Sequence, residues 1–244
     1  MAENSPFIKN LASSDKEIRD NALDSLRTYL AGRSEIPELD LLKLWKGLFY
    51  CLWMQDKPAL QQRLSRDLAS LVSTLRSGVA LPFIRAFFLT MAREWTNIEA
   101  LRLDKYLYLI RQYMNASFQH LAAKKWKPSV LQEFNKIMEE TPLNPTEMKI
   151  PNGLRYHVLD VWVDELEKVK SEWENEKDQE TLETLVQPIE KLAKKGGLKV
   201  VREAAKEVLA EDTLRKWRGQ EDEDMAEPEE EAEDDDDGWG GFDD

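Results

Sequence analysis

Cysteine and histidine are both scarce in this sequence. Among its 244 residues there is one cysteine, Cys51, and there are two histidines, His120 and His157. A single cysteine cannot form a disulfide within the chain, which fits a reducing compartment such as the cytosol or the nucleus. These three residues are also too few for most zinc sites, whose ligands are predominantly cysteine and histidine. We therefore expect neither a disulfide framework nor a metal site.

Recognisable catalytic motifs are lacking as well. The sequence contains no glycine-rich phosphate loop of the Walker type and no local motif of a serine or cysteine nucleophile. Its many carboxylates fall within helical patterns, where they are typical of solvated faces. The sequence therefore predicts a non-catalytic protein without a cofactor. The enzymatic alternative is a nuclease that uses clustered carboxylates and a metal ion.

Long apolar runs are absent too. The longest ones, residues 39–54 and 79–91, are shorter than the roughly 20 residues of a helical bilayer span, and they contain Lys43, Lys46 and Arg85. The N-terminus lacks the basic and apolar blocks of a signal peptide. We expect an intracellular, soluble protein that makes no membrane contact.

Charge is present in abundance but is unevenly distributed. The formal net charge is −13, yet all 34 lysines and arginines lie in residues 1–218, whereas residues 219–244 hold 15 of the 47 acidic residues. Acidic runs bury too little apolar surface to offset the loss of chain entropy on folding. We predict an α-helical repeat domain over residues 1–218, nearly neutral, and a disordered acidic tail over residues 219–244. Trp239 and Phe242 in the tail are candidate partner anchors.

Apolar residues recur at helical spacing throughout residues 1–218, and no strand-like alternation is found. Spacings of three and four place such residues on one face of a helix. The clearest stripes are Leu60, Leu64, Leu68, Leu71 and Leu75, and then Leu103, Leu107, Ile110, Met114, Phe118 and Leu121. The sequence predicts an all-α fold.

Helix boundary signals recur with a regular period. Asp15, Asp56 and Asn97 lie in similar segments at expected helix starts and are 41 residues apart. A period of about 40 residues is that of two-helix HEAT-type units, which bury their apolar faces by stacking. We therefore predict a HEAT-like helical-repeat solenoid. Ser14 is its expected first N-cap, Ser77-Gly78 are expected to end the Leu60 helix, and proline-rich residues 141–153 form a loop or sub-boundary.

A basic segment is the first candidate for binding. Between Leu101 and Lys127 the only acidic residue is Asp104, and the cations are Arg102, Lys105, Arg111, Lys124, Lys125 and Lys127. The interleaved aromatics Tyr106, Tyr108, Tyr113, Phe118 and Trp126 suggest either base stacking on RNA or simple core packing. We expect core packing for these aromatics. For the cations, RNA binding and a purely solvated face remain two open interpretations, as they do for Lys191, Lys194, Lys195, Lys199 and Arg202.

Three segments resemble a known family. Residues 45–58, with the sequence WKGLFYCLWMQDKP, residues 95–106, with WTNIEALRLDKY, and residues 151–160, with PNGLRYHVLD, are similar to motifs of the ribosomal RNA-processing protein 1 family. The resemblance implies a non-catalytic assembly factor of the large ribosomal subunit, located in the nucleus and nucleolus, that supports pre-rRNA processing. It also implies binding to the pre-60S ribosomal particle and to Brix-domain and propeller-type assembly factors.

The motif positions and the basic segment together give the candidate binding residues: Lys46, Lys57, Arg102, Lys105, Arg111, Lys124, Lys125 and Lys127. Asp56 and Asp104 are alternative, intramolecular partners of these cations and would fix one repeat against the next. Some family members carry basic extensions, whereas this sequence has an acidic one, so direct contact with pre-rRNA would have to come from the helical body. The functional alternative is an acidic-tailed chaperone for a basic ribosomal or histone protein.

Overall fold

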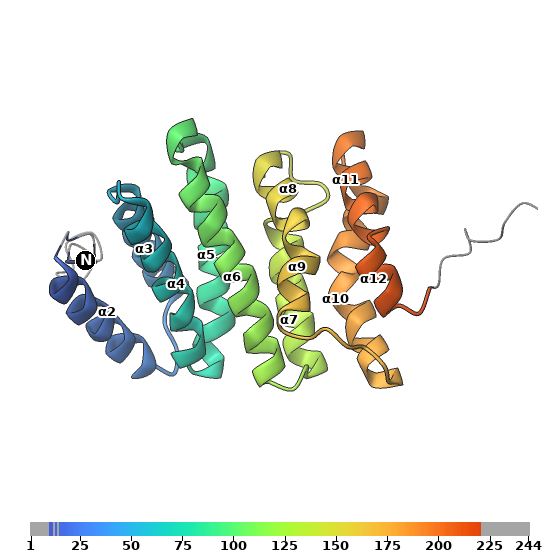
Figure 1. Ribbon diagram of the computed structural model, residues 1–244, viewed down its shortest axis with the longest axis horizontal. Helices are drawn as coiled ribbons and strands as arrows, with labels where there is room; N and C mark the ends of the chain where they lie inside the picture. Colours follow the sequence, from blue (N-terminus) through green and yellow to red (C-terminus); the bar gives the residue numbers. More distant parts are fainter. Residues whose placement is uncertain (1–9, 12, 14, 221–244) are drawn as a thin grey trace, which may run out of the picture.

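A computed structural model describes residues 10, 11, 13 and 15–220 of the chain (Figure 1). Within these residues the secondary structure is α-helical with short 3₁₀ turns, and no β-strand occurs. The predictions of an all-α fold and of a helical-repeat solenoid are confirmed. Ser14 and the tail beyond Gln220, with Trp239 and Phe242, lie outside the described residues.

The helices stack in order along the chain. Their bounds are α2 Lys16–Ala31, α3 Glu38–Trp53, α4 Pro58–Thr74, α5 Ser77–Glu94, α6 Leu103–Ala123, α7 Pro128–Glu140, α8 Asn152–Asp160, α9 Trp162–Glu167, α10 Glu176–Lys195, α11 Lys199–Leu209 and α12 Asp212–Trp217. Two 3₁₀ turns, η2 Trp95–Asn97 and η3 Ala100–Arg102, connect α5 to α6. The loop expected over residues 141–153 is found over residues 141–151, between α7 and α8, and Asn152 already begins α8.

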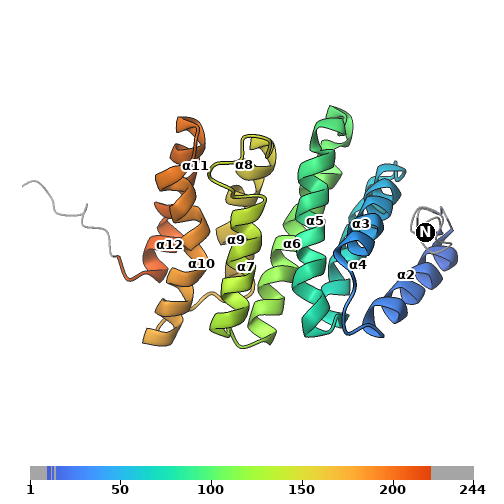
Figure 2. The ribbon, with the colours of Figure 1, turned by 180° about the vertical axis from the view of Figure 1, so that it is seen from behind.

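The stack has two layers, seen from opposite sides in Figures 1 and 2. In one layer α4 packs against α2 and α6, α6 against α8 and α9, and α8 against α11. In the other layer α3 packs against α5, α5 against α7, and α7 against α10. The first-layer helices α2, α4 and α6 begin 42 and then 45 residues apart, at Lys16, Pro58 and Leu103. This spacing matches the period of about 40 residues expected of two-helix units.

Aromatic side chains fill the centre of the core, which runs without interruption from Leu11 to Trp217. The Trp45 indole is fully buried, donates from Nε1 to the Phe83 carbonyl at 3.0 Å, and lies about 5 Å from the rings of Phe83, Phe87 and Tyr113. The hydroxyls of Tyr106 and Tyr113 donate to the carbonyls of Phe49 and Leu68, at 3.0 and 2.8 Å. These bonds satisfy the only polar atoms that the tyrosine rings bring into the core.

Three helix boundaries differ from the sequence predictions. The N-cap of α2 is Asp15, whose carboxylate accepts from the backbone N–H groups of Glu17 and Ile18. Ser77-Gly78 begin α5 instead of ending α4, and a Cβ on Gly78 would lie 2.9 Å from the Ser34 carbonyl oxygen. Glycine is therefore needed there for a close approach of two backbones. The segment around Asn97 forms a 3₁₀ turn ahead of α6, not the start of the α-helix.

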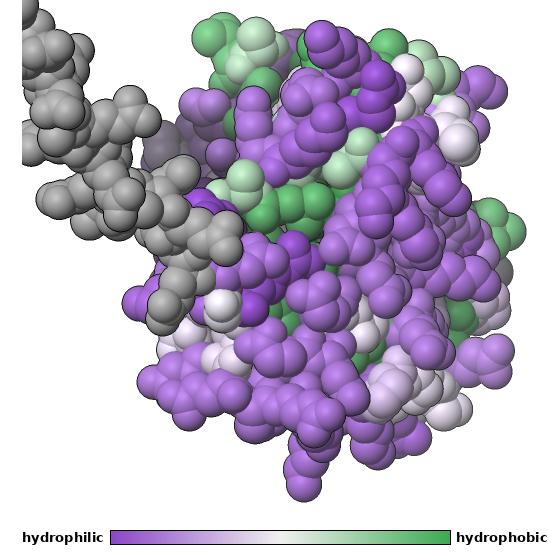
Figure 3. Space-filling view, turned by 90° about the vertical axis from the view of Figure 1, so that its right-hand side faces the viewer, coloured by the Kyte–Doolittle hydropathy of each residue, from purple (hydrophilic) through white to green (hydrophobic). Residues whose placement is uncertain are grey.

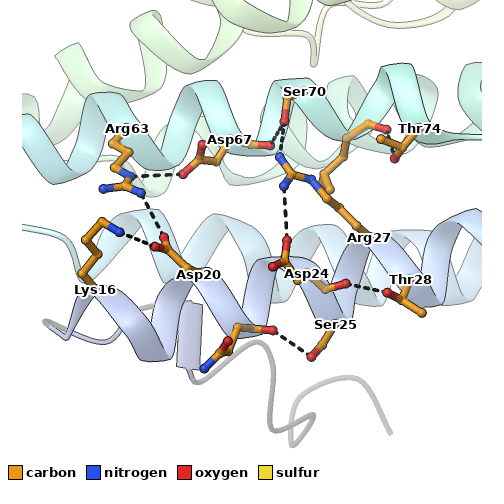
Figure 4. A network of polar contacts seen from close by, with 12 residues as sticks. Lys16, Asp20, Asp24, Ser25, Arg27, Thr28, Arg63, Asp67, Ser70 and Thr74 are labelled. Carbon is orange, nitrogen blue, oxygen red and sulfur yellow. Dashed lines mark hydrogen bonds and ion pairs between the residues drawn. The ribbon is translucent and has the colours of Figure 1, made fainter.

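Charged side chains join α2 to α4 at the N-terminal end of the stack (Figure 4). Arg63 Nη2 lies 3.0 Å from Asp20 Oδ1, and Arg27 Nη2 donates to Ser70 Oγ at 2.9 Å. A hydrogen bond from Lys16, supported by Arg63, lowers the pKa of Asp20. At the opposite end, the surface of α10–α12 is mostly hydrophilic (Figure 3), as expected for a terminal repeat of a solenoid.

Candidate functional site

Two of the predicted binding cations lie at the C-terminal end of α3. Lys105 Nζ donates to the carbonyls of Trp53 and Gln55, at 2.7 and 2.9 Å. Arg102 Nη1 donates to the same Trp53 carbonyl at 2.7 Å, and its guanidinium lies 5.2 Å from the centre of the Trp53 ring. The last carbonyls of a helix lack partners within the helix and carry partial negative charge, so cations stabilise them. Arg102, the last residue of η3, and Lys105 on α6 therefore cap α3.

Burial and acidic neighbours complete this joint. Lys105 is only 5% exposed, and burial together with the adjacent Arg102 lowers its pKa to about 8. Arg102 forms ion pairs with Asp56, at 3.2 Å, and with Glu99, at 3.1 Å. The expected intramolecular role of Asp56 is confirmed. Asp104 is exposed on the first turn of α6 and forms no ion pair with another described residue.

Arg111 has a similar position between two helices. Its Nη1 lies 2.9 Å from Glu165 Oε1 and 3.2 Å from Asp164 Oδ2, both on α9. Glu165 is only 2% exposed and also accepts from Lys168 Nζ at 2.6 Å. A buried carboxylate is tolerated only when it is paired, because its desolvation costs several kcal/mol. Arg111 thus joins α6 to α9.

The two motif lysines near α3 differ from each other. Lys46 is half-buried on α3. Lys57 is exposed immediately before α4, and its backbone carbonyl accepts from the N–H groups of Leu60 and Gln61 at 2.9 and 3.0 Å. The Lys57 backbone therefore begins α4, while its side chain points to solvent.

Lys124, Lys125 and Lys127 surround the turn between α6 and α7. Lys125 and Trp126 both have positive φ, 55° and 53°, and the Trp126 N–H bonds to the Leu121 carbonyl at 3.0 Å, which closes the helix. Lys125 and Lys127 are exposed, and Lys124 is half-buried. None of the three lysines forms an ion pair within the described part of the chain. Their charges are available to a partner, in contrast to those of Arg102, Lys105 and Arg111.

The Trp126 ring holds this turn against the C-terminal helices. Its centroid lies 5.9 Å from that of Trp173, which in turn lies 5.9 Å from that of Trp217. Gln179 Nε2 on α10 donates to the carbonyls of Trp173 and Trp217. The indole of Trp126 is therefore used for packing, as are the buried rings of Tyr106, Tyr113 and Phe118. The prediction of core packing is confirmed for these four aromatics but not for Tyr108, which is half-buried and accepts a hydrogen bond from Arg66 Nη1 at 3.0 Å.

A polar groove of about 340 Å³ lies between α4 and α6. It adjoins the basic turn of residues 124–127, because Lys124 is part of its lining. Arg66 on α4 and Lys124 contribute positive charge to it, and no carboxylate occurs among the described residues that line it. The uncharged polar side chains in the groove are those of Ser70, Ser73, Gln112, Asn115 and Gln119. His120 also lines the groove, and burial with the nearby Lys124 lowers its pKa, so that its ring is neutral at pH 7. Amides, hydroxyls and cations are the groups that bind phosphates and base edges of RNA.

Sequence reasoning missed most of the residues in this groove. Gln112, Asn115 and Gln119 recur at spacings of three and four, like the apolar stripe of the same helix. A stripe of uncharged amides is unusual for a solvated face, where charged residues are commoner. This stripe was the signal from which a polar binding groove on α6 could have been predicted. Arg66 could not be identified as a groove residue from the sequence. It is 58 residues from Lys124 in the chain, and only the packing of α4 against α6 brings both into one groove.

The remaining basic cluster, around the turn between α10 and α11, is partly occupied. Lys191 pairs with Glu139 at 2.6 Å, and Arg202 donates to the Gly196 carbonyl at 2.7 Å. Lys194, Lys195 and Lys199 are exposed. In residues 10, 11, 13 and 15–220 no group of three or more His, Cys, Asp or Glu side chains is arranged to hold a metal ion. No described helix is both long and apolar enough to span a bilayer.

Comparisons with known proteins identify the family. The model of a family described as nucleolar protein Nop52 matches residues 2–240. Ribosomal RNA processing protein 1 homolog B of Homo sapiens is 43% identical over 169 residues, which are 67% of this chain and 22% of that protein. Homolog A of Homo sapiens is 38% identical over 170 residues, 67% of this chain and 37% of that protein. The Caenorhabditis elegans homolog is 32% identical over 165 residues, 66% of this chain and 41% of that protein.

The chain thus spans less than half of the length of each of these relatives. The family match, however, covers nearly all of its sequence. The resemblance to the ribosomal RNA-processing protein 1 family is confirmed, as is the expected localisation to the nucleus and nucleolus. The chain belongs to the Nop52 family of nucleolar proteins.

Proposed function

We propose that this chain is a non-catalytic scaffold in the assembly of the large ribosomal subunit and that it supports pre-rRNA processing by binding precursor RNA. The observation that carries the proposal is the polar groove between α4 and α6, which is free of carboxylates along its described lining and adjoins Lys124, Lys125 and Lys127. Phosphate contacts by lysine and arginine provide most of the affinity of such sites. The relatives are named as ribosomal RNA processing proteins, which supports the same role.

The scaffold role assigns different tasks to the predicted binding residues. Arg102, Lys105 and Arg111 keep α3, α6 and α9 in register, so that the groove beside α6 has a fixed shape. Lys124, Lys125 and Lys127 contact RNA. Half-buried Lys46, in the middle of α3, and exposed Lys57, just before α4, contact neighbouring proteins of the pre-60S particle. Among these proteins the family resemblance implies Brix-domain and propeller-type factors.

The test is affinity purification of the tagged full chain from its own cells after gradient sedimentation, followed by sequencing of the associated RNA. Large-subunit precursor rRNA in the heavy fractions is expected. The variant Lys124→Gln/Lys125→Gln/Lys127→Gln should lose most of the crosslinks to this RNA. The matched control Lys194→Gln/Lys195→Gln/Lys199→Gln removes the same charge from an exposed cluster and should retain them. Recovery in light fractions without rRNA would contradict the assembly role.

One feature favours a second function, a chaperone for a basic ribosomal or histone protein. Residues 219–244 contain 15 acidic residues and no basic one. A chain of this composition attracts cationic proteins over a Debye length of about 10 Å in 0.1 M salt. Deletion of residues 219–244 abolishes partner binding if the chaperone function is correct, and leaves the association with precursor rRNA intact if the scaffold function is correct. Mg²⁺-dependent cleavage of precursor rRNA by the pure protein would instead show a nuclease.

A further inference from the structure

An apolar groove of about 630 Å³ is lined by residues from the N-terminal half of α6, from α8, which packs against both α6 and α11, and from α11. Its apolar lining includes Leu103 and Leu107 from α6, Val208 from α11, and the aromatic residues Trp95 and Tyr156. Tyr156 is 37% exposed, and Trp95, Leu103 and Leu107 are half-buried. An apolar hollow of this size on a protein surface marks a binding site more often than an ordinary surface irregularity.

Three carboxylates also line this apolar groove. Asp160 at the end of α8 and Glu207 on α11 are exposed, while Glu211 is half-buried. No lysine or arginine occurs among the described residues that line the groove. Burial, with contributions from Asp164 and Asp160, raises the pKa of Glu211, so these negative charges repel one another. A partner that brings positive charge would relieve this repulsion.

Two cations near the groove in the sequence, Arg111 and Lys206, are already engaged. Arg111 pairs with Asp164 and Glu165, and Lys206 pairs with Glu203 at 3.1 Å. His157 lines the groove, but its Nε2 is hydrogen-bonded to the Leu107 carbonyl at 2.8 Å, and burial lowers its pKa. The imidazole is therefore neutral at pH 7 and does not balance the carboxylates.

This combination selects among possible occupants. Acidic rims repel the phosphates of RNA, and they repel the acidic residues 219–244 of the chain itself. An amphipathic helix inserts apolar residues at positions i, i+3, i+4 and i+7 into such a groove, and lysine or arginine at its borders would meet the three carboxylates. We propose that the groove between α6, α8 and α11 binds an amphipathic helix of a partner protein whose apolar face is bordered by lysine and arginine.

The proposal provides the scaffold with a protein partner, but it does not depend on RNA binding. The two sites lie along different parts of α6, so that either one can be removed without the other. A variant of the basic turn that loses RNA should still bind the helix, and a variant of the acidic rim that loses the helix should still bind RNA. Failure of one proposal is thus distinguishable from failure of the other.

The probe is a fluorescein-labelled helical peptide with leucines at i, i+3, i+4 and i+7 and lysines beside them. Its binding to the full chain is measured by fluorescence anisotropy. Two further peptides serve as comparisons, one with glutamate in place of lysine and one with the same composition in scrambled order. We expect the leucine–lysine peptide to bind and both comparison peptides to bind at least about tenfold more weakly, because they lack either the charge or the apolar face.

Charge reversal in the rim locates the binding site. Asp160→Lys/Glu207→Lys should weaken the leucine–lysine peptide about tenfold or more, since attraction becomes repulsion. The matched control Glu172→Lys/Glu180→Lys reverses two exposed carboxylates of the adjacent α9–α10 region and should leave the affinity unchanged. Circular dichroism verifies that both variants are folded. Carbodiimide crosslinks from peptide lysines should map to Asp160, Glu207 or Glu211.

Three results would overturn the proposal. Equal binding of the scrambled peptide would show non-specific attraction, and equal binding by the rim variant and the wild type would place the peptide elsewhere. Self-association of the full chain that disappears in the Asp160→Lys/Glu207→Lys variant would show that a second copy occupies the groove.

Discussion

Lys105 and Lys124 lie at the two ends of α6, yet their surroundings differ completely. Lys105 is buried and donates to two carbonyls at the end of α3. Lys124 follows the last turn of α6, lines a polar groove and forms no ion pair within the described residues. The same residue type on one helix therefore serves the fold at one end and is available for binding at the other.

The difference between Lys105 and Lys124 arises from the groups that surround each end of α6. The N-terminal half of α6 is surrounded by carbonyls of α3 and carboxylates of α9, which recruit Arg102, Lys105 and Arg111. The C-terminal end adjoins hydroxyls and amides from α4 and α6. A local surplus of cations in a sequence thus identifies a binding surface only where no carboxylate or helix terminus from another segment has reached it.

The largest effect is expected at the buried lysine. Lys105→Met retains the packing of the aliphatic stem but leaves the Gln55 carbonyl without its charged donor and the Trp53 carbonyl with Arg102 alone. A hydrogen bond from a charged group contributes about 1.5–3 kcal/mol to stability. We therefore expect the free energy of unfolding, measured by urea titration, to fall by about 2–3 kcal/mol. Lys124→Met at the other end should change it by less than about 0.5 kcal/mol. Equal losses at the two sites would remove the distinction between them.

The next effect is on RNA affinity, and here the C-terminal end of α6, with Lys124, is expected to matter more than the N-terminal end, with Lys105. Lys124→Gln/Lys125→Gln/Lys127→Gln should weaken binding of single-stranded precursor RNA by about tenfold. It should also reduce the slope of log affinity against log salt by about 2, because three phosphate contacts are lost at roughly 0.7 each. Filter binding at several salt concentrations measures both quantities. An unchanged slope would mean that these lysines do not contact phosphates.

A pH titration sharpens the contrast further. The folded-state pKa of Lys105 is about 8, below the ordinary value of 10.5. Between these two values the unfolded chain holds a proton that the folded chain has released, so folding becomes more favourable as the pH rises through this window. The neutral amine still donates its hydrogen bonds. The stability of the wild type relative to Lys105→Met should therefore increase from pH 8 to pH 10.5, whereas the wild type relative to Lys124→Met should show no such increase.

The smallest effect should separate stability from binding within the basic turn. Lys125 has a φ of 55°, a backbone conformation that glycine adopts without strain. Lys125→Gly should therefore raise the free energy of unfolding by about 0.5–1 kcal/mol while it lowers RNA affinity. Lys127→Gly is the control, since Lys127 has a φ of −58° and gains nothing from glycine. A destabilised Lys125→Gly variant would show that the lysine side chain supports the turn.

Helical periodicity was sufficient to predict the all-α solenoid and its core. The stripes through Leu68 and Ile110 are buried as expected except at Leu60, Leu103 and Leu107, which are half-buried. The period of about 40 residues is present in the spacing of α2, α4 and α6. Boundaries were less predictable. Gly78 lies in the first turn of α5, where a side chain would collide with the Ser34 backbone, and this close approach is a tertiary contact that no local sequence signal contains.

The candidate site was predictable only in part, for a related physical reason. The basic residues between Leu101 and Lys127 appeared unbalanced because Asp104 is the only acidic residue within that segment. Glu99 engages Arg102 from three residues away, but Asp56, which also engages Arg102, and Glu165, which engages Arg111, are 46 and 54 residues away. Which cations remain available is decided by the stacking of repeats, and the two grooves beside α6 combine residues of helices that are distant in sequence.

The uninterrupted core has a consequence for how the molecule melts. In a stack, each repeat is stabilised mainly by its immediate neighbours, so cooperativity is transmitted only through successive interfaces. In the first layer α6 is the link between α4 on one side and α8 and α9 on the other. A lesion at its centre would divide one transition into two, whereas an equal lesion in α2 would shorten the cooperative unit by a single terminal repeat. Both binding grooves are lined partly by residues of α6, so a lesion at the centre of this helix would disturb both.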